Sequence, residues 1–299
     1  MAKIAVFTER YTLRSSAEMS ALIHFRHAAF ELGHQLDFLF RNEIKYLENY
    51  EAVLIRALTD PLNASYVVAR LAQMMGLRVI DDPESIRICC DKVNMYQHLL
   101  KKQVSMPRTI FLDREELCLT KGNELLALLG APVVLKAPNS CFSHYVEKVS
   151  TAEEFLTVGK RFLRRADRLI AQQYTPSEFD WRVITLNERV LAVVKYVFAP
   201  HTWRIADQSE QGEGLKVIGV PREKADPQLL KTALLAGASI GRGLYGIDLK
   251  ETSEGYVVIE VNDNPNIDAG YEDQHCPGIY REIIRYLAGE NLDAETIIS

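Results

Sequence analysis

Short apolar runs alternate with longer segments of helical spacing in the first part of the chain. Strands are expected at 3–9, 35–40, 51–57 and 78–82, and helices at 16–32 and 61–75. Strands that alternate with helices in this way indicate a parallel, doubly wound sheet with helices on both faces. The glycine-rich turn of dinucleotide-binding proteins is absent after the first strand, where Thr8–Thr12 stands instead, so the pattern does not favour a dehydrogenase.

The pattern changes after Asp82-Pro83, where a new helix is expected to begin and to continue until Val104–Pro107. Beyond it, apolar spacing predicts strands at 108–112, 131–136, 169–174, 181–186, 190–198 and 215–220, and helices at 121–130, 151–166, 227–241 and 277–288. Thr151 is a suitable helix N-cap, and Asn187-Glu188 is a suitable tight turn. The later strands are expected to be antiparallel, so the chain combines an α/β part with an α+β part.

The most informative segment is the run Tyr256–Pro265, in which polar and apolar residues alternate. Glu260 and Asn262 are expected to leave the same face of this strand. Asp248 lies on the preceding apolar run, and Thr252–Gly255 would turn one run back onto the other as a hairpin. Three oxygen ligands would then converge, which suits magnesium or manganese better than zinc, and such magnesium commonly bridges nucleotide phosphates. The alternative on spacing alone is a solvated hairpin face with ordinary acids.

Composition narrows the class of protein. A chain of 299 residues fits two or three packed modules, and 47% hydrophobic with 25% charged residues is typical of a globular protein. The net charge is only -5 and no long basic run occurs, so nucleic acid is not expected as a partner. No apolar stretch suits a membrane span or a signal region, and a cytoplasmic protein is expected. The five cysteines lack a C-x-x-C pair, so neither a disulfide framework nor a zinc knuckle is indicated.

Several further residues could contact a nucleotide, although each has a structural alternative when taken alone. Lys92 and Lys136 stand at element boundaries, where an ammonium group could reach a phosphate, but either could be a surface lysine. Gln172–Tyr174 ends an apolar strand and could offer backbone groups and an aromatic face to adenine, or could be a polar strand end. Arg182 and Arg204 could hold an anionic intermediate through a two-point fork, or form structural ion pairs.

The order of these pieces along the chain resembles the layout of ATP-grasp enzymes, and more narrowly that of the RimK-like carboxylate–amine ligases. The matching stretches are Asp91-Lys92, Leu135–Pro138 with Phe142-Ser143, Glu178–Arg182, Lys195-Tyr196, Trp203–Ile205, Leu244–Lys250 and Ile259–Gly270. The resemblance is firm from about Asp81 to Leu287. It implies an ATP-grasp fold with an N-terminal Rossmann-like domain at 1–85, a central subdomain at 86–170 and a C-terminal subdomain with the metal site at 171–299.

The resemblance also implies roles for individual residues. Lys136 would contact the ATP phosphates, Gln173 and Tyr174 the adenine edge, and Asp180 the ribose. The implied ATP-binding residues are Lys92, Lys136, Gln173, Tyr174, Asp180 and Arg204. The implied ligands of two Mg or Mn ions are Asp248, Glu260 and Asn262. The implied catalytic cations are Arg182 and Arg204. Ser140 and Tyr145 depart from the family pattern, because the family has glycines in this phosphate-covering loop. Gln173 also stands in place of a glutamate, and Asn266 in place of a glycine.

The activity implied by the resemblance is amide formation through an acyl phosphate. ATP would phosphorylate a substrate carboxylate, and an amine would displace the phosphate. The acid and the amine are left open among amino acids, peptides and a protein tail, and a homo-oligomer is compatible with this interpretation. Two other classes also remain open: an ATP-binding module without turnover, and a phosphotransferase that stops at a phosphorylated product.

Overall fold

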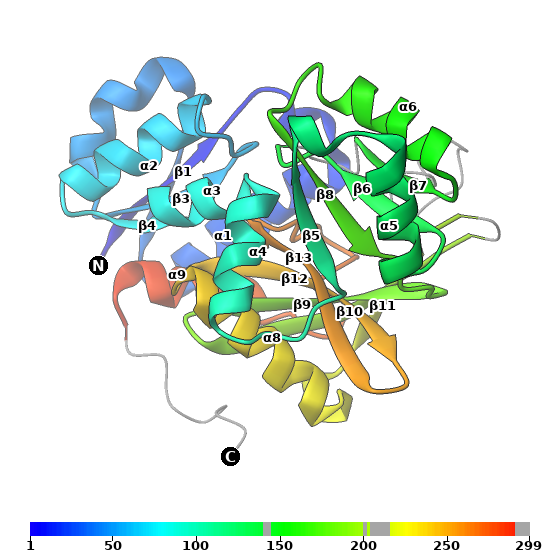
Figure 1. Cartoon of the computed structure of the whole chain (residues 1–299). Helices are drawn as coiled ribbons and strands as arrows, with labels where there is room; N and C mark the ends of the chain where they lie inside the picture. Colours follow the sequence, from blue (N-terminus) through cyan, green and yellow to red (C-terminus); the bar gives the residue numbers. More distant parts are fainter. Residues whose placement is uncertain (140–144, 200–201, 204–215, 291–299) are drawn as a thin grey trace.

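Three β-sheets follow one another along the chain (Figure 1). The computed structural model describes residues 1–139, 145–199, 202–203 and 216–290. Within this part of the chain, no helix combines the length and the apolar character needed to cross a membrane.

The first sheet is parallel and has the strand order β2-β1-β3-β4, as the alternation of strands and helices predicts. Its elements are β1 (Lys3–Thr8), η1 (Thr12–Arg14), α1 (Ser16–Glu31), β2 (Gln35–Leu39), η2 (Arg41–Asn49), β3 (Ala52–Arg56), α2 (Ala64–Met74) and β4 (Arg78–Ile80). Alternate residues of β1 enter two different cores: Ile4 packs in the cluster that contains α1, and Phe7 in the cluster that contains α2. The sheet is therefore buried on both faces, which explains its nearly continuous apolar strands.

The helix expected from Asp82-Pro83 onward is in fact two helices, α3 (Pro83–Cys89) and α4 (Lys92–Lys101). Asp91 lies between them in an extended conformation, and its side chain accepts hydrogen bonds from the backbone N–H groups of Val93 and Asn94. The expectation of one helix was wrong because this internal aspartate caps a new helix instead of continuing the first. The break places Lys92 at the first residue of α4.

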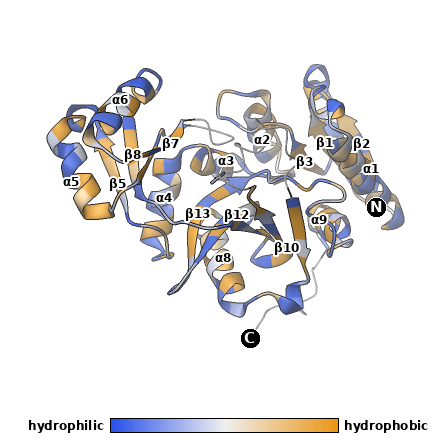
Figure 2. Ribbon diagram, turned by 90° about the vertical axis from the view of Figure 1, so that its right-hand side faces the viewer, coloured by the Kyte–Doolittle hydropathy of each residue, from blue (hydrophilic) through white to orange (hydrophobic). Residues whose placement is uncertain are grey.

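The second sheet is antiparallel and has the order β5-β8-β6-β7. Its elements are β5 (Thr109–Asp113), η3 (Arg114–Glu116), α5 (Leu119–Leu129), β6 (Val133–Lys136), β7 (Val146–Val149), α6 (Ala152–Phe162) and β8 (Arg168–Gln173). The Thr151 hydroxyl accepts from the Glu154 N–H, which confirms the predicted N-cap of α6. Figure 2 shows α5 and α6 with both hydrophobic and hydrophilic parts, as expected for helices that cover one face of a sheet.

The third sheet is antiparallel and has the order β11-β10-β9-β12-β13. Its elements are β9 (Phe179–Leu186), β10 (Arg189–Val197), β11 (Lys216–Val220), η4 (Arg222–Lys224), α8 (Pro227–Ile240), β12 (Leu244–Thr252) and β13 (Gly255–Asp263). Asn187 and Glu188 both have positive φ, 47° and 64°, so the predicted tight turn is confirmed. The predicted hairpin of the two acidic runs is also confirmed as β12–β13, in which Asp248 lies opposite Glu260.

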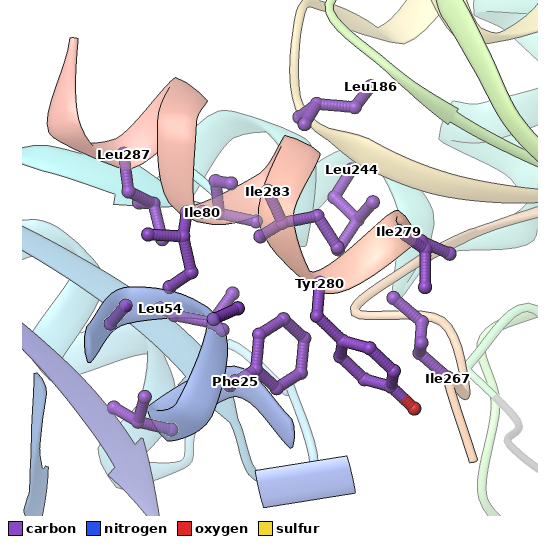
Figure 3. Packing of buried hydrophobic residues seen from close by; sticks show 14 of the residues in the cluster. Phe25, Leu54, Ile80, Leu186, Leu244, Ile267, Ile279, Tyr280, Ile283 and Leu287 are labelled. Carbon is purple, nitrogen blue, oxygen red and sulfur yellow. The ribbon is translucent and has the colours of Figure 1, made fainter. Parts of the chain in front are cut away.

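The final helix α9 (Ile279–Ala288) returns to the first sheet and packs against α1. Figure 3 shows Tyr280 of this helix beside Phe25 of α1, and their rings meet edge to face at 4.9 Å between centroids. The same core holds Leu186 and Leu244 of the third sheet. This shared core fixes the first sheet relative to the β12–β13 hairpin, so the carboxyl ends of β1 and β3 are held near the end of β13.

Candidate active site

A pocket lies between the second and third sheets and brings most of the candidate residues together. The predicted residues that line it are Lys92, Lys136, Gln173, Tyr174, Asp180, Asp248 and Glu260. Arg182 and Asn262 are not part of the lining, but both contact Asp248. Arg204 lies outside the described residues, as do Ser140 and Cys141 of the loop after β6. The pocket is therefore made by strands and a helix that are far apart in the sequence.

Four polar or aromatic lining residues were not given a role from the sequence: Gln172, Thr175, Trp203 and Lys250. The signal for Lys250 was available, since it lies two residues after Asp248 on β12 and so leaves the same face of the strand. The signal for Gln172 was ambiguous. Gln172 and Gln173 are neighbours at the end of β8, and apolar alternation did not show that both would line the pocket. Gln172 is buried and Gln173 is exposed.

Lys136 ends β6 and is buried at the floor of the pocket. Its Nζ donates hydrogen bonds to Tyr96 Oη at 2.8 Å and to Gln172 Oε1 at 2.7 Å. Burial lowers the pKa of Lys136 to about 8, although the Glu260 carboxylate opposes this change. Two neutral partners do not compensate a buried ammonium group, so Lys136 is an incompletely neutralised cation that favours an anionic ligand.

Asp180 and Lys250 form a second buried pair in the lining, with Lys250 Nζ donating to Asp180 Oδ1. Burial raises the pKa of Asp180 to about 6, and the neighbouring Lys250 limits that rise. Their strands β9 and β12 are neighbours in the third sheet, which brings the two side chains together. The pairing leaves Asp180 predominantly ionised at neutral pH, so it can accept hydrogen bonds from hydroxyl groups.

Two aromatic side chains in contact with each other form part of the pocket lining. The rings of Tyr174 and Trp203 meet edge to face with centroids 6.0 Å apart. Lys148 Nζ lies 4.7 Å from the centre of the Tyr174 ring and 4.8 Å from that of Trp203. The lining here also contains the aliphatic side chains of Val134, Val146 and Ile259. An apolar slot with an aromatic wall and nearby backbone groups suits a purine base.

The predicted metal ligands lie together on the β12–β13 hairpin, and each carboxylate is paired with a cation. Arg182 donates to both oxygens of Asp248, through Nε at 2.7 Å and Nη2 at 2.8 Å. Asn262 Nδ2 lies 3.1 Å from Asp248 Oδ2. Glu260 Oε1 lies 2.7 Å from Lys92 Nζ. Burial would raise the pKa of Glu260, but Lys92 and other cations lower it below its ordinary value, so the carboxylate is ionised.

These residues fit a hard divalent cation that is completed by phosphate oxygens. Among the described residues, no group of three or more His, Cys, Asp and Glu side chains could hold a metal by itself. Asp248 and Glu260 supply two carboxylates and Asn262 a carboxamide, which is the set of oxygen ligands that magnesium uses together with substrate phosphates. A metal would share Asp248 with Arg182 and Glu260 with Lys92, so nearby positive charge already balances both ligands.

Arg182 is held from its other side by a chain of hydrogen bonds. Its Nη1 lies 3.3 Å from Tyr196 Oη, and the Tyr196 hydroxyl donates to Glu272 Oε1 at 2.6 Å. Glu272 Oε2 accepts from the backbone N–H of Asp268 at 2.8 Å. The chain of hydrogen bonds therefore links Asp248 to the segment that follows β13 and holds the Arg182 guanidinium group against the Asp248 carboxylate.

A chain with this arrangement of three sheets, and with a polar pocket between the second and third, is an ATP-grasp protein. The structure is similar to that of D-alanine–D-alanine ligase from Bacillus anthracis complexed with ATP, with a TM-score of 0.72, 14% identity and coverage of 98% of both chains. It is also similar to a RimK domain ATP-grasp protein from Sphaerobacter thermophilus, with a TM-score of 0.69, 17% identity, and coverage of 96% of this chain and 100% of the other.

Residues 89–287 match the RimK-like ATP-grasp domain, so the chain belongs to the RimK-like ATP-grasp family. A probable alpha-L-glutamate ligase 2 of Pseudoalteromonas atlantica is 24% identical over 286 residues, which cover 89% of each chain. A probable alpha-L-glutamate ligase of Pseudoalteromonas translucida is 27% identical over 226 residues, which cover 74% of this chain and 71% of the relative. The resemblance drawn from the sequence motifs is thereby confirmed.

Proposed function

We propose that this protein is an ATP- and magnesium-dependent carboxylate–amine ligase that forms an amide or peptide bond through an acyl phosphate. The observation that carries the proposal is the pocket, in which the Asp248 and Glu260 carboxylates share a lining with the buried cation Lys136. Family membership and relatives named as glutamate ligases support the same reaction class. Because ATP is supplied in the cytoplasm, we place the enzyme there.

The proposed reaction has two steps. A carboxylate oxygen of the acid attacks the γ-phosphorus of ATP, ADP leaves, and an acyl phosphate forms. The amine nitrogen then attacks the acyl carbon, inorganic phosphate leaves, and the nitrogen loses a proton as the amide forms. Neither step needs a covalent enzyme nucleophile, so the residues act by positioning and by stabilising charge.

We assign the ATP contacts from the geometry of the pocket. Lys136 binds a phosphate group, because it is a buried cation whose two hydrogen-bond partners among the described residues are both neutral. Tyr174 and Gln173 border the adenine slot, and Asp180 accepts from a ribose hydroxyl. Lys92 is placed next to Glu260 and adds a phosphate contact at the start of α4. Lys250 and Gln172 keep Asp180 and Lys136 in position.

Asp248, Glu260 and Asn262 would hold one or two magnesium or manganese ions, with manganese able to substitute because it prefers the same oxygen ligands. Such ions supply neutralising charge to the phosphates during transfer. Two arginines complete the proposed site. Arg182 holds Asp248 in one orientation through both carboxylate oxygens, and Arg204 is assigned to the transferring phosphoryl group from the family pattern. A structural neighbour, the ATP-grasp ligase PsnB, was solved with Mg and ADP, which supports magnesium and an adenine nucleotide as the bound groups.

The test is acid-dependent ADP formation with hydroxylamine as the amine. With a panel of amino acids and peptides as acids, one or more should stimulate ADP release and yield a hydroxamate. Glu260→Gln should abolish both signals. Glu254→Gln is the matched control, because Glu254 is exposed in the turn of the same hairpin and should leave both signals unchanged. ATP binding without acid-dependent ADP release would identify a nucleotide-binding module. ADP release without hydroxamate would identify a phosphotransferase.

A further inference from the structure

A second pocket lies where the amino end of β4 meets the end of α9 and the third sheet. Its volume is about 430 Å³, and its lining consists of Arg78, Asn187, Arg189, Arg242, Tyr286, Gly289 and Glu290. Within the described part of the chain, no residue lines both this pocket and the ATP pocket. Its volume is in the range of pockets that bind small molecules. The pocket is therefore a candidate binding site that the proposed ligase reaction does not use.

Three arginines reach this pocket from segments that are distant in the sequence. Arg78 is the first residue of β4, and Arg189 is the first residue of β10. Arg242 lies between α8 and β12. Figure 3 shows Ile80 of β4 beside Leu287 of α9, in the core that the first sheet shares with the third. The tertiary fold, and not a local run of basic residues, thus brings the three guanidinium groups to one cavity.

The lining carries an excess of positive charge. It holds three arginines and one glutamate, Glu290, which gives it a formal charge of +2. Glu290 is already paired outside the lining: its Oε1 lies 2.9 Å from His34 Nε2, and its Oε2 lies 3.7 Å from Arg285 Nε. A cavity lined by charges of one sign concentrates ligands of the opposite sign. The pocket therefore favours an anion.

Arg78 is held in place by the end of α9. Its Nη1 donates to the Leu287 carbonyl at 2.8 Å. Its guanidinium group also lies against Gly289, where a Cβ atom would overlap it, and Gly289 has a φ of 78°. A neutral carbonyl orients a guanidinium group without cancelling its charge. The glycine thus leaves room for a cation that is positioned before any ligand binds.

Arg242 lies at the exposed side of the pocket. Its Nε lies 3.6 Å from Glu188 Oε1, in a pair whose side chains are 75% and 58% exposed. Such a pair contributes little stability, because water and salt screen it. The Tyr286 hydroxyl donates to the Arg242 carbonyl at 3.4 Å, which ties this backbone segment to α9. The Arg242 side chain can therefore turn toward a ligand at small cost while its backbone stays in place.

We propose that this cavity, the arginine pocket formed around Arg78, Arg189 and Arg242, binds a small molecule with two or more phosphate or carboxylate groups. A guanidinium group holds either kind of group through a two-point fork, and three arginines favour several anionic groups over a single one. Because Arg78 belongs to the first sheet and Arg189 to the third, the ligand joins the two sheets. Binding therefore stabilises the folded protein.

Binding is measured with the ATP pocket blocked by magnesium and a non-hydrolysable ATP analogue. The probes are propanediol bisphosphate and propanetricarboxylate, with propyl phosphate as the probe that has a single anionic group. At least one of the first two should raise the melting temperature and bind in calorimetry, and propyl phosphate should bind at least ~10-fold more weakly. Binding of the bisphosphate alone would identify a phosphorylated ligand, and binding of the tricarboxylate alone a carboxylate ligand. If neither binds, or if propyl phosphate binds as tightly, the proposal is overturned.

Substitutions then locate the site. Arg189→Gln and Arg242→Gln should each weaken binding of the tighter probe by ~10-fold or more, because each removes a charged fork. Gly289→Ala keeps every arginine but displaces the Arg78 guanidinium group, so it should also weaken binding. Arg26→Gln is the matched control, since Arg26 is exposed on α1 and does not line the pocket. Wild-type affinity in Arg189→Gln and Arg242→Gln, or an equal loss in Arg26→Gln, would overturn the proposal.

Stability and charge separate a binding role from a structural one. Without a probe, Arg242→Gln should melt within a degree or so of the wild type, because its pair with Glu188 is exposed. Glu290→Gln removes the negative charge of the lining and should bind the multivalent probe more tightly than the wild type. Weaker binding by Glu290→Gln would contradict the proposal. None of these measurements involves turnover, so they test the arginine pocket independently of the ligase reaction.

Discussion

ATP binding should be accompanied by uptake of a proton on Lys136. This residue is buried with two neutral hydrogen-bond partners, and burial lowers its pKa to about 8. A phosphate group placed against the ammonium group would favour the charged form and raise the pKa again. The lysine is therefore partly neutral before ATP binds and fully charged afterwards.

The size of this effect follows from the pKa. At pH 8, about half of the free protein has a neutral Lys136, so ATP binding should take up ~0.5 proton; at pH 7 the neutral fraction is about one-tenth and the uptake ~0.1 proton. The sign is fixed by the direction of the shift, because a cation that gains an anionic partner binds more protons. ATP affinity should consequently fall as pH rises above about 8, approaching tenfold per pH unit while Lys136 stays charged in the complex.

The assay is isothermal titration with ATP and magnesium at pH 7 and pH 8, in two buffers that differ in ionisation enthalpy. The difference in heat between buffers gives the number of protons taken up, after correction for the protons that ATP itself exchanges. Lys136→Met should abolish the difference between pH 7 and pH 8, and Lys160→Met, on the exposed side of α6, should not. Equal uptake by the wild type and Lys136→Met would refute both the low pKa and the phosphate contact.

Substitutions at three positions test other parts of the site. Glu260→Gln should lower the free energy of unfolding by about 2 kcal/mol, because the charged hydrogen bond between Glu260 and Lys92 is lost. The same variant should not show the rise in melting temperature that magnesium and ATP give the wild type. Arg182→Gln should lower the free energy of unfolding by ~3 kcal/mol, because the Asp248 carboxylate loses its cationic partner. Magnesium should bind this variant more tightly than the wild type. Tyr145 has a φ of 55°, so Tyr145→Gly should be ~1 kcal/mol more stable than Tyr145→Ala in chemical denaturation. Equal stabilities of the last two variants would show that backbone strain is small there.

Local patterns in the sequence were enough to predict the β12–β13 hairpin. Asp248, Glu260 and Asn262 alternate with apolar residues on two runs joined by a short turn, and the paired register follows from that. The sequence pattern did not predict the shift of strand register within this hairpin. Glu260 lies opposite Asp248 but Val258 lies opposite Leu249, so one strand contains an extra residue at 259. The alternation of buried residues is interrupted there, and the Ile259 carbonyl accepts a hydrogen bond from Tyr96 at 2.7 Å.

Contacts between distant segments could not be predicted from spacing. The sequence suggested Arg182 as a charge that steadies a phosphate, whereas the structure places its Nε and Nη2 on Asp248 and its Nη1 on Tyr196. The pairing depends on β9 lying beside β12, and no local pattern specifies that neighbour. The same holds for Arg56 and Asn264, which are 208 residues apart in the chain and are joined because α9 packs on the first sheet.

The charges of the pocket explain why both the nucleotide and the metal are needed for a productive site. Asp248 and Glu260 are satisfied by Arg182 and Lys92 when nothing is bound, so a metal ion alone must compete with two cations that are already in place. Phosphate oxygens would give these cations new partners and complete the coordination of the ion. When ATP and the metal ion bind together, the metal ion takes the carboxylates while the phosphates take the displaced cations. Neither charge is then left unpaired, so the binding of ATP and of the metal ion is coupled. The ion pairs that hold the two carboxylates in the unliganded protein are thus the contacts that would make the binding of magnesium depend on ATP.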